Sequence, residues 1–218
     1  MKNKITFLLL LTGIFAFSPG FLTAQDATAT KILGDVSKTY KAYKTIKAQF
    51  ALNVKQSNGG AIKQSGTLYL KGKKFRIDMT GQEIYCDGKT MWTYFKEENE
   101  VQISDYNPDD QEINPADIFT IYEKGFNYRY TGESIKGSKK VQQIELTPTN
   151  KNRPYFKVKL SIEKSTHKIE DMSIMNKNGS VATYAVTGFN GNININDTFF
   201  KFDEKNKPGV IVIKLNGN

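Results

Sequence analysis

A rhythm of short apolar segments constrains the fold of this chain more than any other feature. From Phe50 to Leu215, segments of alternating apolar and polar residues recur at spacings of roughly 8 to 12 residues. Turn-forming residues separate them, most clearly at Asn58-Gly59-Gly60, Asp87-Gly88 and Asn178-Gly179. About eleven or twelve strands result, with no self-similar repeat of the kind that marks propellers and solenoids. The pattern therefore predicts a mainly β (α+β) fold built on one meandering antiparallel sheet.

Two segments depart from the strand rhythm. Apolar residues recur at spacings of three and four from Ile32 to Phe50, with lysines on another face, which is typical of an amphipathic helix. Within residues 107–125, Asn114-Pro115 is a helix-start signal that precedes Ile118 and Phe119. We therefore expect an N-terminal helix and a short helix inserted between strands.

The number of strands implies an interior that side chains alone cannot fill. Eight strands close into a barrel whose interior is just filled, so about eleven leave a wider space. Two helices offer little to fill it, and we expect either an incomplete, partly flattened barrel or an apolar cavity. The residues expected to face inward are apolar and carry no ionisable group: Phe50, Leu52, Leu68, Leu70, Phe75, Ile77 and Met79. For any one of them, ordinary core packing is the alternative to ligand contact.

The N-terminus has the pattern of a secretory signal peptide. Lys2 and Lys4 precede an apolar stretch from residue 5 to residue 17, and Leu22-Thr23-Ala24 offers a small residue for cleavage. We therefore expect residues 1–24 to be a signal peptide and residues 25–218 to form a single periplasmic domain. An uncleaved anchor is the alternative, but the apolar stretch is shorter than the roughly 20 residues of a membrane span.

The charge balance limits the partners of an exported protein. The chain carries 31 Lys and Arg against 22 Asp and Glu, a net charge of +9 that falls to +7 without Lys2 and Lys4. Outside the cytoplasm, anionic lipid headgroups or an acidic partner surface are available, whereas nucleic acid is not. The densest basic cluster, residues 71–76, also fits a solvated strand rim.

Catalytic and metal-binding patterns are missing from the sequence. One Cys and one His exclude a disulfide framework, a Cys/His zinc site and most nucleophilic constellations. We expect His167 to lie in an exposed turn and Cys86 to be a small buried apolar residue. Residues 105–109 begin like a calcium loop, but Asp110 replaces the required Gly and Ala116 stands in the place of the bidentate Glu. We expect no enzyme activity, no cofactor and no metal.

Several short motifs in a fixed order carry a resemblance to a known family. They are Gln49-Phe50, Gly66-Thr67-Leu68-Tyr69-Leu70, Lys74-Phe75-Arg76-Ile77, residues 87–94, Val101-Gln102-Ile103, Pro115, Leu146-Thr147-Pro148, Asn178-Gly179, Phe200-Lys201-Phe202 and Pro208-Gly209-Val210. In this order, from about Lys47 to the C-terminus, the chain resembles the LolA family of periplasmic outer-membrane lipoprotein carriers.

The resemblance implies a fold, a cargo and partners. The fold would be an incomplete barrel of about eleven strands, with helices as a lid over an apolar cavity. The cargo would be the acyl chains of lipoproteins, received from an inner-membrane ABC transporter and passed to an acceptor lipoprotein at the outer membrane. Phe75 matches a cavity-facing Phe of the family, and Ile118 and Phe119 match its lid helix. By the same match, the cavity lining includes Phe50, Leu68, Leu70 and Ile77.

One local departure from the family concerns a basic residue. The family often places a basic residue and then Pro before the third strand, and it links an Arg there to lid closure. This chain has Gly72-Lys73-Lys74 instead, and the resemblance does not transfer that role to Arg76.

Four functions are compatible with the sequence. We expect a monomeric carrier that binds lipoprotein acyl chains and shuttles them from the inner to the outer membrane. The main alternative is a periplasmic module of the same fold that senses a lipid or lipoprotein. An enzyme acting on lipid or glycan and a structural envelope protein are the remaining alternatives, because a fold of this kind does not by itself fix a function.

Overall fold

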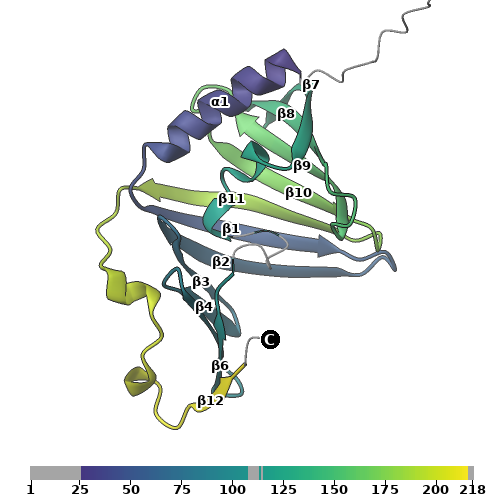
Figure 1. Ribbon diagram of the computed structural model, residues 1–218. Coiled ribbons are helices and arrows are strands. Elements are labelled where there is room, and N and C mark those ends of the chain that lie inside the picture. The colour runs from purple at the N-terminus through teal and green to yellow at the C-terminus, as the bar shows by residue number, and fades with distance from the viewer. Residues whose placement is uncertain (1–25, 108–112, 114, 216–218) are drawn as a thin grey trace, which may run out of the picture.

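The computed structural model describes residues 26–107, 113 and 115–215 (Figure 1). The expected signal peptide lies outside the described residues, as do residues 108–112 of the acidic loop and Asn114. Across the described part of the chain, no helix has the length and apolar character needed to cross a membrane.

The described residues form one α-helix and twelve strands. In chain order these are α1 Ala27–Lys41, β1 Ile46–Lys55, β2 Ala61–Lys71, β3 Lys74–Met79, β4 Gln82–Cys86, β5 Thr90–Phe95, β6 Glu100–Asp105, β7 Phe126–Lys136, β8 Lys139–Pro148, β9 Tyr155–Glu163, β10 Ile169–Asn176, β11 Val181–Gly191 and β12 Ile211–Lys214. Short 3-10 turns lie at η2 Pro115–Asp117, η3 Ile121–Glu123, η4 Asp197–Phe200 and η5 Glu204–Asn206.

All twelve strands belong to one unclosed sheet, in the order β12-β6-β5-β4-β3-β2-β1-β11-β10-β9-β8-β7. Two antiparallel meanders, β1 to β6 and β7 to β11, join where β1 pairs with β11. The sheet curves so that α1 lies across the second meander (Figure 1). The mainly β fold and the incomplete barrel are thus confirmed. The expected single meander is wrong in two places. β6 and β7 are consecutive in the chain but not neighbours in the sheet, because β1 pairs with β11 instead, and β12 returns from the C-terminus to pair with β6 in parallel.

The N-terminal helix begins at a well-defined cap. One carboxylate oxygen of Asp26 accepts hydrogen bonds from the amides of Thr28 at 2.9 Å and Ala29 at 3.1 Å. The other oxygen accepts the Tyr130 amide of β7 at 2.9 Å, which fixes the start of the helix on the sheet. The apolar face of α1 is buried against the sheet through Ala29, Ile32, Leu33, Val36 and Tyr40.

The helix is shorter than the apolar spacing predicts. It ends at Lys41, and β1 begins at Ile46, although the helical pattern extends to Phe50. Ile46, Ala48 and Phe50 also fit the two-residue period of a strand. This segment forms a strand because it pairs with β2 on one side and with β11 on the other.

The insert between β6 and β7, residues 106–125, contains 3-10 turns in place of the expected short helix. Ile118 and Phe119 lie between η2 and η3. Phe119 nevertheless packs between α1 and the sheet. Its ring stacks on Tyr40 of α1 with centroids 4.4 Å apart and lies edge-on to Phe189 of β11 with centroids 6.2 Å apart. The segment therefore covers the sheet without forming the predicted lid helix within the described residues.

Residues 199–202 fall among the segments between Phe50 and Leu215 that the sequence predicts as strands, and a strand there is wrong. Phe199 and Phe200 belong to a 3-10 turn, η4, which the Asn196 side chain caps by accepting the Phe199 amide at 3.1 Å. Lys71 and Lys74 bind Asp197 at 2.9 and 2.6 Å and attach the turn to β2 and β3. Hydrogen bonds from these lysines lower the pKa of Asp197 to about 2.

Candidate functional site

The register of the strands defines an inner face of the sheet, on the side of α1 and the insert. Ile46, Leu70, Phe75 and Cys86 are paired across β1 to β4, so their side chains share this face. The next layer along these strands is Ala48, Leu68, Ile77 and Ile84, and the third includes Phe50, Gly66 and Met79. All seven residues predicted to face inward therefore lie on one face.

Near α1 this face is tightly covered. Leu68, Leu70 and Phe75 are only 7%, 6% and 1% exposed. The Tyr106 ring, which leads into the insert, lies edge-on to Phe75 with centroids 5.6 Å apart. The cleft between α1 and the insert at this end holds about 210 Å³, less than the roughly 300 Å³ at which small-molecule pockets begin. We call this covered region the deep end.

Toward the β1–β2 turn the same face is less covered, and most of its apolar side chains are half-buried. We define the apolar trough as the half-buried inner-face residues beyond the deep end: Phe50, Leu52, Ile77, Met79, Ile84, Tyr184 and Val186. Four of these were predicted from the sequence. Tyr184 and Val186 on β11 were missed because only the pairing of β1 with β11 brings them beside Leu52 and Phe50.

A glycine forms part of the floor of the trough. Gly66 pairs with Phe50 on one side and with Met79 on the other. A Cβ built on Gly66 would lie 2.7 Å from the Asp78 carbonyl oxygen, 2.7 Å from Phe50 Cζ and 2.8 Å from Met79 Cγ. The Phe50 ring therefore lies directly over the backbone of β2, and a side chain at position 66 would displace it.

We expect Gly66→Ala to lower the free energy of unfolding by about 2 kcal/mol, since overpacking against backbone forces a local shift. Gly34→Ala is the matched control, because a Cβ at Gly34 meets no atom within 4 Å and the residue lies inside α1. There the change should stabilise by about 1 kcal/mol. Urea unfolding curves measure both values, and equal effects of the two substitutions would contradict the close packing at Gly66.

The insert is tied to α1 by polar contacts as well as by ring stacking. The hydroxyl groups of Ser37 and Tyr122 lie 3.1 Å apart, and Lys41 forms an ion pair with Glu123 at 2.7 Å. Burial raises the pKa of Tyr122 to about 12. Burial opposes ionisation of Glu123 too, but hydrogen bonds from Lys41 and Ser37 outweigh it and lower the pKa of that carboxyl. These polar contacts join α1 to the insert beside the deep end, and they do not lie among its apolar side chains.

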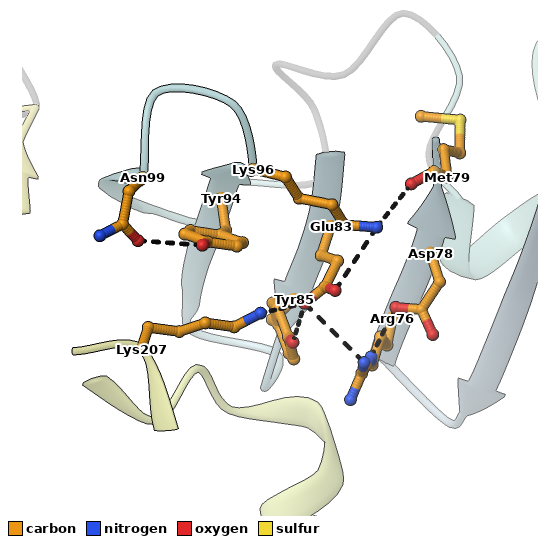
Figure 2. A network of polar contacts seen from close by, with 9 residues as sticks. All are labelled: Arg76, Asp78, Met79, Glu83, Tyr85, Tyr94, Lys96, Asn99 and Lys207. Carbon is orange, nitrogen blue, oxygen red and sulfur yellow. Dashed lines mark hydrogen bonds and ion pairs between the residues drawn. The ribbon is translucent and has the colours of Figure 1, made fainter. Parts of the chain in front are cut away.

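The outer face of β3 to β5 carries a polar network instead (Figure 2). Arg76 donates to Asp78 at 2.7 Å and lies over the rings of Tyr85 and Phe199, 4.5 and 4.6 Å from their centroids. Glu83 accepts the Tyr85 hydroxyl at 2.5 Å. Arg76 thus holds the segment between β11 and β12, residues 192–210 and called here the C-terminal segment, against the sheet, and it faces away from the trough and the insert.

A hollow of about 550 Å³ lies beneath the C-terminal segment on this outer face. Its lining includes Arg76, Lys201, Asp203 and Lys207. Burying an acyl chain among charged groups is unfavourable, because they lose hydration without a polar partner. The larger hollow is therefore the poorer candidate for a lipid site.

The basic residues at the start of β3, Lys73 and Lys74, form no ion pair with the described part of the insert. Lys74 binds Asp197 of the C-terminal segment, and Lys73 is exposed.

Two other residues considered in the sequence analysis, Cys86 and His167, lie outside the apolar trough. Cys86 is fully buried, and burial raises the pKa of its thiol to about 11. His167 lies in the β9–β10 turn with a positive φ of 55° and is half-buried rather than fully exposed as expected.

No group of three or more His, Cys, Asp or Glu side chains that could hold a metal ion occurs among residues 26–107, 113 and 115–215. The side chains of the apolar trough carry no charged group, so this surface can bury hydrocarbon and exclude water. An acyl chain suits it better than a polar metabolite.

Comparison with known proteins agrees with this geometry. An outer-membrane lipoprotein carrier protein of Coxiella burnetii is 24% identical over 221 aligned residues, which cover 97% of this chain and 99% of that protein. An uncharacterised protein of Methanocaldococcus jannaschii is 26% identical over 170 residues, which cover 74% of this chain but only 48% of that protein. The fold is shared with an uncharacterised conserved protein of Thermus thermophilus, at a TM-score of 0.58 and 14% identity, covering 86% of this chain and 99% of that chain.

A family model shows the relationship most directly. The model described as outer membrane lipoprotein carrier protein LolA matches residues 41–203, which include strands β1 to β11, the insert and η4. The matched region thus contains every residue of the apolar trough. This chain belongs to the LolA family.

Proposed function

We propose that the protein is a periplasmic lipoprotein carrier that holds lipoprotein acyl chains in the apolar trough. The observation that carries the proposal is the half-buried apolar stretch that continues from the deep end across β1, β3, β4 and β11. Family membership supports the same role, since the matching model describes lipoprotein carriers. Residues 1–24 would direct export and residues 25–218 would form the carrier domain.

The free energy of hydrocarbon transfer implies that such a carrier must be loaded by a partner that supplies energy. Removing an acyl chain from a bilayer costs about 0.8 kcal/mol per methylene, so several long chains amount to tens of kcal/mol. Non-covalent affinity saturates near roughly 20 kcal/mol. A chain of 218 residues cannot extract a multiply acylated lipoprotein by equilibrium binding alone. An ATP-driven inner-membrane transporter would load it, and an acceptor lipoprotein at the outer membrane would bind the chains more tightly.

The contacts of the insert suggest how the trough could lengthen. Tyr106 and Phe119 cover the deep end, while the polar contacts to Ser37 and Lys41 lie at its edge. Displacement of Phe119 from Tyr40 would uncover Leu70 and Phe75 and extend the apolar surface. Loading would then exchange aromatic contacts within the protein for contacts with hydrocarbon.

The proposal is tested by release of lipoproteins from spheroplasts. Added protein should bring newly synthesised, acylated lipoproteins into the soluble fraction as one-to-one complexes, in an ATP-dependent manner. A non-acylated form of the same lipoprotein, with its lipidated Cys replaced by Ser, is the control and should not bind. Failure to release any native lipoprotein would overturn the carrier and leave the sensing module of the same fold.

A further inference from the structure

Three loops that are far apart in the sequence form one end of the sheet. The Lys177 amide of the β10–β11 turn donates to the Pro154 carbonyl of the β8–β9 loop at 2.8 Å. A Cβ built on Gly179 would lie 3.1 Å from the Cβ of Ser57 in the β1–β2 turn. We call residues 55–63, 149–156 and 176–181 together the three-loop end.

The charges of the three-loop end all have one sign. Its three segments contain no Asp or Glu. Lys55, Lys63, Lys151 and Lys177 are exposed, and none of them forms an ion pair with any residue in the described part of the chain. The positive charge is therefore available to an external partner.

The opposite end of the same strands shows the contrast. There, around the β7–β8 and β9–β10 turns, lysines are neutralised by carboxylates. Lys139 binds Glu170 at 2.7 Å and Lys164 binds Glu133 at 2.6 Å. Lys136 binds Asp171 in the same region. These three lysines at the opposite end are thus paired with carboxylates, whereas the three segments of the three-loop end contain no carboxylate that could pair with their lysines.

Exposed apolar side chains accompany these lysines. Ile62 is 47% exposed and Phe156 is 51% exposed, and both belong to the three-loop end. Cationic side chains beside exposed apolar ones suit a bilayer surface, which offers anionic headgroups and an apolar interface together. An acidic protein surface would satisfy the charges but not Ile62 and Phe156.

The apolar trough opens toward this end. Along β1, exposure increases from Ile46 and Ala48, which are buried, to Phe50, Leu52 and Val54, which are half-buried. Val54 is followed directly by Lys55. A bilayer in contact with the three-loop end would therefore lie beside the open side of the trough.

We propose that the three-loop end docks the protein on anionic phospholipid bilayers and orients the trough toward the membrane. The purpose of this docking rests on the proposed function, whereas the charge pattern of the three-loop end does not depend on any cargo. The recognised chemistry is the phosphate of anionic headgroups within a bilayer.

Vesicle flotation tests the proposal with the purified protein. We expect binding to vesicles of phosphatidylcholine with about 30% phosphatidylglycerol, weaker binding to phosphatidylcholine alone, and loss of binding in high salt. Each lysine near such a surface contributes roughly a 5-fold effect. The quadruple variant Lys55→Gln, Lys63→Gln, Lys151→Gln, Lys177→Gln should therefore bind about 600-fold more weakly.

A second quadruple variant is the matched control. Lys31, Lys73, Lys89 and Lys205 are exposed, form no ion pair within the described residues and lie outside the three-loop end. Replacing all four with Gln removes the same net charge and should leave affinity within about 3-fold of the starting value, because distant charges are screened. Equal losses in the two variants, or equal binding to neutral and anionic vesicles, would overturn the proposal.

The orientation can be read from a fluorophore. Cys86, the only cysteine, is fully buried, so a thiol introduced at the surface is labelled selectively. An environment-sensitive dye on Ile62→Cys should brighten and shift to the blue with anionic vesicles. The same dye on Ile135→Cys, which is 72% exposed at the opposite end, should not change. A response at position 135 alone would contradict this orientation.

Cargo binding separates this inference from the proposed function. Fatty-acid binding measured without vesicles should be unchanged in the three-loop variant. If the starting protein binds vesicles through these lysines but releases no lipoprotein from spheroplasts, the carrier fails and membrane docking stands. If it releases lipoproteins but does not bind anionic vesicles, docking is overturned and the carrier stands.

Discussion

Ile77→Glu is expected to weaken binding of a long-chain fatty acid about 100-fold. Ile77 lies in the middle of the trough, paired with Leu68 on β2 and Ile84 on β4, and it is half-buried. A bound acyl chain would cover the new carboxylate and remove its water without offering a hydrogen bond, which is strongly unfavourable. Displacement of a fluorescent fatty acid measures the affinity directly.

The control for Ile77→Glu lies on the other face of the same sheet. Ile103 is half-buried on β6 and pairs with Trp92 on the outer face. Ile103→Glu introduces the same charge at similar burial and should leave fatty-acid affinity within about 2-fold. Circular dichroism should show folded protein for both variants. If both substitutions weaken binding equally, the ligand does not lie on the inner face.

Phe75→Ala is expected to reduce the free energy of unfolding by about 3 to 5 kcal/mol, the range for aromatic truncation in a core. Phe75 is 1% exposed and packs edge-on against Tyr106. Although the sequence predicts it as a cavity-lining residue, in this structure it is part of the covered deep end. Its removal would leave a cavity that the insert and β3 cannot fill.

Leu52→Ala is the comparison for Phe75→Ala. Leu52 lies on the same face but is half-buried in the trough, so its truncation should cost only about 1 kcal/mol. Urea denaturation of both variants, with unchanged m-values, measures the difference. A cost for Phe75→Ala no greater than that for Leu52→Ala would show that the deep end is loosely packed rather than covered.

Much of the fold could be predicted because strand alternation and turn residues are local properties of a sequence. The hairpins at residues 58–60 and 178–179 form where their turn residues lie. The errors arise where the secondary structure of a segment depends on pairing or packing with residues far away in the sequence. Ile46 fits a helical and a strand period equally, and only its partners Leu70 and Gly191 resolve the choice. The stretch around Phe199 alternates like a strand, yet it covers the outer face through contact with Tyr69.

The candidate site was predictable to the same extent. Alternation places Phe50, Leu52 and their neighbours on one face, and the structure agrees with that placement. It cannot distinguish Phe75, which is covered, from Ile77, which is half-buried, because exposure depends on where α1 and the insert pack. Binding of acyl chains by these residues stays a prediction that the measurements above address.

Photo-crosslinking in cells tests the central claim most directly. A benzophenone side chain at Phe50, in the trough, should capture the acylated portion of lipoproteins, and the capture should disappear when lipidation is blocked. The same group at Tyr69, half-buried on the outer face of β2, should capture none. Capture at Tyr69 without capture at Phe50 would contradict an acyl-binding trough on the inner face.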